Sequence, residues 1–77
     1  MTRYSATFEI SDHVNTFAIL DSRAETAARA RGGLTYESNI DGGTATWIFE
    51  REEARDWFLH LAWGFDHRRP IHTENSN

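Results

Sequence analysis

The sequence contains no cysteine, and this absence excludes both a disulfide framework and a thiolate zinc site. The fold must therefore be stabilised by packing or by self-association, and a reducing compartment is its natural location. Lysine is absent as well, because all eight basic residues are arginine. Such usage suits a GC-rich coding genome, although arginine also has the better geometry for pairing with carboxylates.

Long apolar runs and strong positive charge are also missing. No run approaches the roughly 18 residues of a membrane-spanning helix. Residues 1–5 lack the basic region and hydrophobic stretch that begin a secretion signal. The net charge is −4 and the pI is about 5.4, so direct binding to nucleic acid is not expected. We expect a soluble, cytoplasmic protein that does not bind membranes.

Aromatic residues are plentiful, because three Trp, five Phe and two Tyr make up 13% of the 77 residues. This share is well above that of a disordered acidic segment, and it predicts one folded domain. A single core of this size yields only a few kcal/mol of net stability. Every large apolar side chain is therefore expected in the core unless its position argues otherwise.

The first half of the chain shows a strand pattern and then a helix signal. Residues 3–10 alternate between apolar and polar side chains, which predicts a half-buried strand. After a polar break, residues 14–20 are rich in β-branched and aromatic side chains and predict the second strand of a hairpin. Ser22 and Glu25 have the spacing of a capping box, so a helix is expected over 22–31. The buried stripe of this helix contains only alanines, namely Ala24, Ala27 and Ala28.

The second half repeats this layout. Residues 34–40 and 44–49 alternate around a turn that contains Gly42 and Gly43, which predicts a second hairpin. Residues 50–64 then show the period of a helix with one apolar face. The members of that face are Ala54, Trp57, Phe58, Leu61, Ala62 and Phe65.

These patterns predict an α+β fold, in which a four-stranded antiparallel sheet carries two helices on one face in the order ββαββα. Residues 1–66 are expected to form the single domain. Residues 67–77 contain little apolar surface and are expected to form a mobile tail.

The histidines and carboxylates offer no recognisable catalytic site. His60, His67 and His72 match no zinc pattern, so no metal or other cofactor is expected. Paired acid–base catalysis needs a pocket that separates two pKa values, and 77 residues leave little room for one. The serines lack the signature of a nucleophile elbow. The sequence therefore predicts that the protein is not an enzyme and that these side chains are solvated.

The outer face of the last helix is the candidate binding surface. It carries Glu52, Asp56, Leu59 and Trp63 at successive i, i+4, i+7 and i+11 positions. A Trp and a Leu that face outward suggest a covered interface, and Trp is enriched at interface hot spots. The acidic residues could also dock on a basic groove that otherwise holds phosphate.

Two further arginines and two alternatives belong to this interpretation. Arg68 and Arg69 are expected to be secondary contacts of the same surface. The chain could instead fold back through Pro70 and Ile71 to cover Trp63, or the helix could end near Leu61. Either alternative would remove the reason for a binding surface on this face.

One segment resembles a known family. The run Phe49-Glu50-Arg51-Glu52-Glu53-Ala54-Arg55-Asp56-Trp57-Phe58-Leu59-His60-Leu61, thirteen of the 77 residues, is similar to the sheet-to-helix segment of a small phage-encoded anti-CRISPR protein of the type I-F group. The resemblance consists of core-type residues, and no binding position is carried over from it. It implies a non-enzymatic inhibitor in the host cytoplasm that docks on a CRISPR-Cas surveillance complex and blocks its nucleic-acid binding or nuclease recruitment.

The sequence therefore favours a non-enzymatic protein-binding module that occupies a surface of a larger protein complex. The alternative is an uncharacterised homodimeric structural domain, in which an exposed helix face or strand edge pairs with a second copy.

Overall fold

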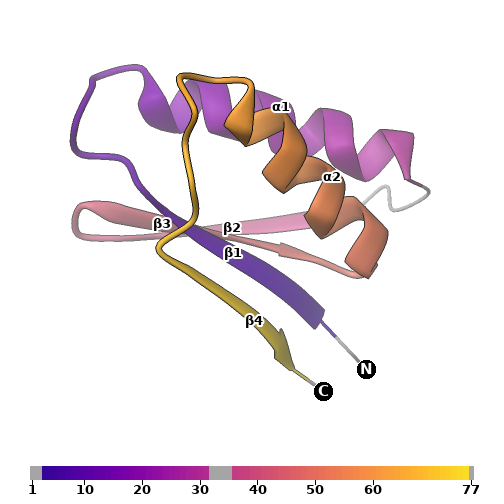
Figure 1. Cartoon of the computed structure of the whole chain (residues 1–77). Helices are drawn as coiled ribbons and strands as arrows, with labels where there is room; N and C mark the ends of the chain where they lie inside the picture. Colours follow the sequence, from indigo (N-terminus) through magenta and orange to yellow (C-terminus); the bar gives the residue numbers. More distant parts are fainter. Residues whose placement is uncertain (1–2, 32–35, 77) are drawn as a thin grey trace.

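A computed structural model describes residues 3–31 and 36–76 of the chain. The elements are β1 (Arg3–Glu9), α1 (Thr16–Ala30), β2 (Tyr36–Asp41), β3 (Thr44–Phe49), α2 (Glu52–Trp63) and β4 (His72–Ser76). Both helices lie on one face of the sheet (Figure 1), and the paired strands are antiparallel. The predicted α+β class, with four antiparallel strands and two helices on one face, is therefore confirmed.

The order of the elements corrects the predicted ββαββα. The chain runs βαββαβ and the strands lie in the order β2-β3-β1-β4, which is the ferredoxin-like or split βαβ arrangement. The predicted first hairpin does not form, because its second strand is helical. The fourth strand comes instead from the segment that was expected to be a tail.

Helix α1 begins earlier than the capping box predicts. Residues 14–20 have strand-like composition, yet Thr16 and Leu20 are fully buried one turn apart and continue the alanine stripe of the same helix. Packing on the sheet therefore outweighs local β propensity. Ser22 lies in the second turn and is exposed, so it does not cap the helix.

The centre of the core is aromatic. Phe58 of α2 is fully buried, and its ring centroid lies 5.3 to 5.4 Å from those of Phe8, Trp47 and Phe49. Trp47 also donates a 3.0 Å hydrogen bond from Nε1 to Asp21 of α1. These contacts join both helices to the two central strands.

The hairpin between β2 and β3 agrees with its prediction. Ala45, Trp47 and Phe49 face the helices and are buried. Gly42 has a φ of +63°, a conformation that glycine adopts without strain. Residues 32–35, which include the predicted glycine end of the first helix, lie outside the described residues.

The tail expected over 67–77 contains β4, which pairs with β1 along the edge of the sheet. The backbone amide of Ile71 donates to the carbonyl of Thr7 at 2.8 Å. His72, Thr73, Glu74 and Asn75 are all exposed. Backbone pairing with β1, rather than an apolar face, defines this strand, and apolar periodicity therefore does not predict it. No helix in the described part of the chain is long and apolar enough to cross a membrane.

Candidate functional site: the side formed by α2 and β4

Arg55 anchors this side of the molecule. Only 7% of the residue is exposed, although it was expected on a solvated helix face. Its Nη1 donates to the side-chain oxygen of Asn75 in β4 at 3.0 Å and to the carbonyl of Ser5 in β1 at 3.4 Å. Its guanidinium also lies 5.8 Å from the ring centroid of Tyr4. Arg55 therefore ties α2 to both β1 and β4.

Two predicted contact residues, Glu52 and Asp56, surround this arginine. Asp56 Oδ1 lies 2.8 Å from Arg55 Nε, and Glu52 Oε2 lies 3.6 Å from Arg55 Nη2. About half of the Glu52 side chain and 60% of the Asp56 side chain remain exposed. Both carboxylates therefore balance the buried cation while they still present negative charge to solvent.

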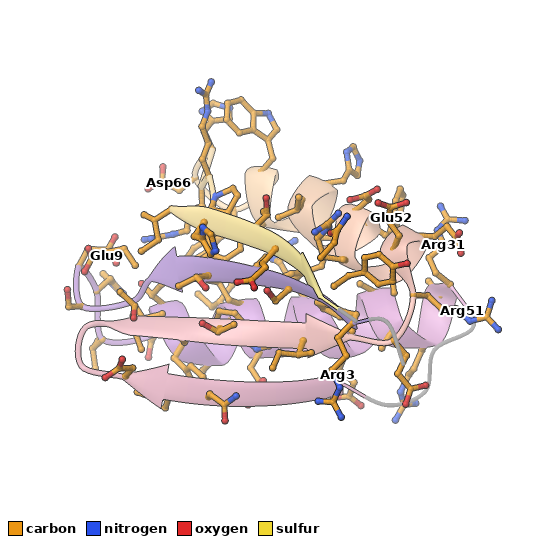
Figure 2. All side chains as sticks on the ribbon, turned by 90° about the horizontal axis from the view of Figure 1, so that it is seen from below. Arg3, Glu9, Arg31, Arg51, Glu52 and Asp66 are labelled. Atoms are coloured by element: carbon orange, nitrogen blue, oxygen red, sulfur yellow. The ribbon has the colours of Figure 1, made fainter. Side chains whose placement is uncertain are left out.

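Leu59 continues the ridge that Arg55 begins. Arg55, Leu59 and Trp63 are spaced four residues apart and form one i±4 ridge of α2. Leu59 is half-buried and packs against the core. In Figure 2, which shows the sheet from below, α2 extends past the edge that β4 forms. Because Arg55 contacts β4, the ridge follows this edge.

Trp63 lies at the end of the ridge in a defined cluster. The residue is 42% exposed. Its ring centroid lies 4.7 Å from that of His67, and the Arg69 guanidinium lies 5.0 Å from it. The chain does return toward Trp63, as the alternative expected, but the ring contacts come from His67 and Arg69 and leave much of the indole accessible.

The turn after α2 holds this cluster in place. Asp66 and His67 both have positive φ, 57° and 54°, which non-glycine residues adopt only at a cost. The amide of His67 donates to the carbonyl of Trp63 at 3.0 Å and so satisfies an end of the helix. The backbone thereby fixes the imidazole beside the indole.

Arg68 was predicted as a secondary contact, but it instead joins the turn after α2 to the start of α1. We call this link the Arg68 clamp. Its Nη2 lies 2.5 Å from Asp12 Oδ2 and 3.3 Å from the hydroxyl of Thr16. Its guanidinium also lies 4.7 Å from the centroid of Phe65. Only 14% of the side chain is exposed, so Arg68 is removed from the contact surface. The hydrogen bond from Arg68 is the main reason that the pKa of Asp12 lies below its usual value.

A second cluster of the same kind was not predicted. The centroid of Trp57 lies 4.9 Å from that of His60 and 4.4 Å from the Arg31 guanidinium. The sequence signal is the i, i+3 spacing of Trp57 and His60, but the contact with Arg31 depends on the packing of the two helices. An indole that contacts both an imidazole and a guanidinium therefore occurs in the middle of α2 and again at its end.

The described residues form an open depression near the start of α1. One open depression of about 370 Å³ is lined by Asp12, His13, Ile19, Phe65, Asp66 and Arg68. Its Asp12 carboxylate is already paired with Arg68. Within residues 3–31 and 36–76, no group of three or more His, Asp or Glu side chains is arranged to hold a metal ion.

The open face of the sheet is polar. Strand alternation places Ser5, Thr7 and Thr46 there, and the two threonine hydroxyls lie 2.7 Å apart. Sheets that bind single-stranded RNA use aromatic rings on this face to stack the bases. The rings of Phe8, Trp47 and Phe49 are all buried on the opposite face.

No known protein family matches the chain, and no curated protein or solved structure is significantly similar to it. In the segment 49–61, Phe49, Ala54 and Phe58 are buried. These residues of the anti-CRISPR resemblance therefore pack α2 against the sheet.

Proposed function

We propose that the protein is a non-enzymatic protein-binding module that occupies a surface of a larger protein. Its contact surface, here called the α2–β4 side, consists of Glu52, Asp56, Leu59, Trp63 and Arg69 together with the edge of β4. The observation that carries this proposal is Trp63, which is 42% exposed and yet contacts both His67 and Arg69. An aromatic side chain that is fixed before binding loses little entropy when a partner covers it.

The charges on this surface are segregated. Glu52 and Asp56 make the beginning of α2 acidic, whereas Arg69 adds positive charge beyond its end. A partner with the opposite arrangement of charge would be selected in one orientation. The shallow depressions and the polar sheet face support a binding role over a catalytic one or one in nucleic-acid recognition.

The narrower form of the proposal is an inhibitor that acts in the cytoplasm of a phage-infected host. It would dock on a CRISPR-Cas surveillance complex and block its nucleic-acid binding or nuclease recruitment. This form is supported by the resemblance in residues 49–61 and by the acidic pair Glu52 and Asp56, which could replace phosphate in a basic groove.

An affinity capture tests the proposal. The wild type, a Glu52→Ala, Trp63→Ala double variant and a Val14→Ala control would be immobilised and exposed to host lysate and to a purified surveillance complex. Val14 is a suitable control because it is an apolar residue that is 91% exposed and lies outside the α2–β4 side. We expect capture by the wild type and the control, and loss of capture with the double variant.

Two results would contradict the proposal. Equal capture by all three proteins would show that another surface binds the partner. No capture by any of them, from either source, would leave the alternative of a homodimeric structural domain, which the exposed edge of β4 favours.

A further inference from the structure

Strand β4 forms one edge of the sheet. Strand β4 pairs with β1 on one side, and it is the last strand of the sheet on the other. Residues 72–76 include no Pro and no Lys, which commonly protect edge strands. The helices pack over β1, β2 and β3, and α2 reaches β4 mainly through Arg55. The outer backbone groups of β4 are therefore accessible to another strand.

The side chains of β4 are complementary to those of a second copy. His72 and Glu74 lie on the open face of the sheet opposite Thr7 and Ser5, whereas Thr73 lies on the helix side opposite Ala6. If two copies pair antiparallel about a two-fold axis at Thr73, His72 of each copy lies directly opposite Glu74 of the other. Each imidazole can then donate a hydrogen bond to the carboxylate of the other copy, and no like charges face each other.

The same two-fold axis also aligns the α2 ridges. Arg55 lies beside Asn75. Moving two residues along β4, to Thr73, covers about 7 Å, which corresponds to four or five residues of helix. Leu59 therefore lies near the axis, and the two helices run antiparallel across it. The acidic start of each α2 then faces the cationic end of the other.

The same pairing would cover the apolar residues of this ridge. Helix α2 contacts β1 and extends past the edge that β4 forms (Figure 2). Leu59 and Trp63 lie on the ridge and would therefore be covered by the second copy.

The opposite edge of the sheet lacks this complementarity. Strand β2 reads Tyr-Glu-Ser-Asn-Ile-Asp and contains two acidic residues and no basic one. No antiparallel register of β2 with itself brings opposite charges together. Self-pairing is therefore expected at β4 alone.

We infer that two copies of this chain pair through β4 into a continuous eight-stranded sheet, with Leu59 and Trp63 covered at the seam. The pairing itself does not depend on target binding, but its regulatory role rests on the proposed function, because the second copy occupies the same α2–β4 side. The pairing also adds a form of regulation. A second copy and a target protein compete for one surface, so that target binding requires the dimer to dissociate.

Sedimentation analysis of a charge swap tests the pairing. The wild type is expected to be a dimer that dissociates on dilution. His72→Glu and Glu74→His each place like groups opposite one another at two symmetry-related sites, and each should raise the dissociation constant about ten-fold. The double variant, His72→Glu with Glu74→His, restores both pairs and should dimerise like the wild type. Both side chains are about 60% exposed, so the monomer fold should tolerate all three variants.

A cysteine substitution tests the position of the axis. Directly opposite residues in antiparallel strands have Cβ atoms about 4.5–5.5 Å apart, and the closest pairs reach the separation of about 3.5–4.5 Å found in disulfides. Thr73→Cys should therefore give a disulfide-linked dimer under mild oxidation, in a chain that has no other cysteine. Asn39→Cys, an exposed position on β2, is the matched control and should remain unlinked.

The possible results separate this inference from the proposed function. A wild type that is monomeric at every concentration tested, or a double swap that fails to recover, overturns the dimer, while the capture experiment still decides whether the protein binds a target. If the oxidised Thr73→Cys dimer captures the target as well as the reduced protein does, the competition is refuted. Loss of capture on oxidation and recovery on reduction support it.

Discussion

The two helices cover the same face of the sheet but use their residues in different ways. Helix α1 buries three alanines and Leu20, and therefore lies close to the sheet. Helix α2 buries Phe58 and Arg55 and keeps Trp63 outside. This difference indicates that α1 acts as a packing element, whereas α2 both completes the core and carries the proposed contact surface.

The largest expected effect is the loss of the aromatic ring at the centre of α2. Phe58→Ala should lower the free energy of unfolding by about 3–5 kcal/mol, because it leaves a cavity among three other rings. Ala24→Gly on α1 should cost only about 1 kcal/mol, mainly through backbone entropy. Urea denaturation measures both, and equal losses would show that the two helices contribute to the core in the same way.

The next effect concerns the buried arginine of α2. Arg55→Ala should cost about 1–3 kcal/mol, since it leaves the carbonyl of Ser5 and the side chain of Asn75 without their donor. Amide hydrogen exchange should accelerate in β4 more than in β2. Arg51→Ala, at an exposed position, is the control and should change stability by less than about 0.5 kcal/mol. Unchanged exchange in β4 would mean that β1 alone holds this strand.

The clamp between the start of α1 and the turn after α2 should depend on pH. The pKa of Asp12 is lowered in the folded state, chiefly by the hydrogen bond from Arg68. The ionised carboxylate therefore stabilises the fold above its unfolded pKa, and this contribution is lost as the pH falls through the folded pKa. Asp12→Asn should be less stable than the wild type at neutral pH, with the difference vanishing in acid.

A control separates this linkage from general acid denaturation. Glu50→Gln removes an exposed carboxylate and should change stability by less than about 0.5 kcal/mol at neutral pH. If the difference in stability between Asp12→Asn and the wild type were the same at all pH values, the ionised Asp12 would not be the group that stabilises the fold through Arg68. Thermal unfolding at several pH values provides the comparison.

The smallest effect on stability is expected at the exposed tryptophan. Trp63→Ala should cost less than about 1 kcal/mol, because the residue is already 42% exposed. Leu20→Ala on α1 should cost about 2–5 kcal/mol, since Leu20 is fully buried. Strong unfolding of the Trp63 variant would place that side chain in the core and would remove the distinction between the helix faces.

The sequence was informative wherever side chains alternate between core and solvent. Phe8, Trp47 and Phe58 were assigned to the core from periodicity, and all three are buried. The start of α1 was predicted wrongly because Phe17 and Ile19 favour strands locally, while the packing of Leu20 favours a helix. Strand β4 has no apolar period, so only its backbone pairing with β1 reveals it.

The candidate site was predicted in part for a related reason. The helical period of residues 50–64 placed Trp63 on the outer face of α2, and Trp63 is exposed in the structure. The helical period could not distinguish Arg55 from its exposed neighbours. The burial of Arg55 depends on a contact with Asn75, which lies 20 positions later in the sequence. Arg68 was assigned to the surface for the same reason, since its partner Asp12 is 56 positions earlier.

The position of β1 between β3 and β4 has a consequence for folding during synthesis. Tyr4 pairs with Asn75, so this contact forms only after 71 further residues have been added. Whenever β4 is detached, β1 therefore becomes an edge strand whose free side lies beside the aromatic core.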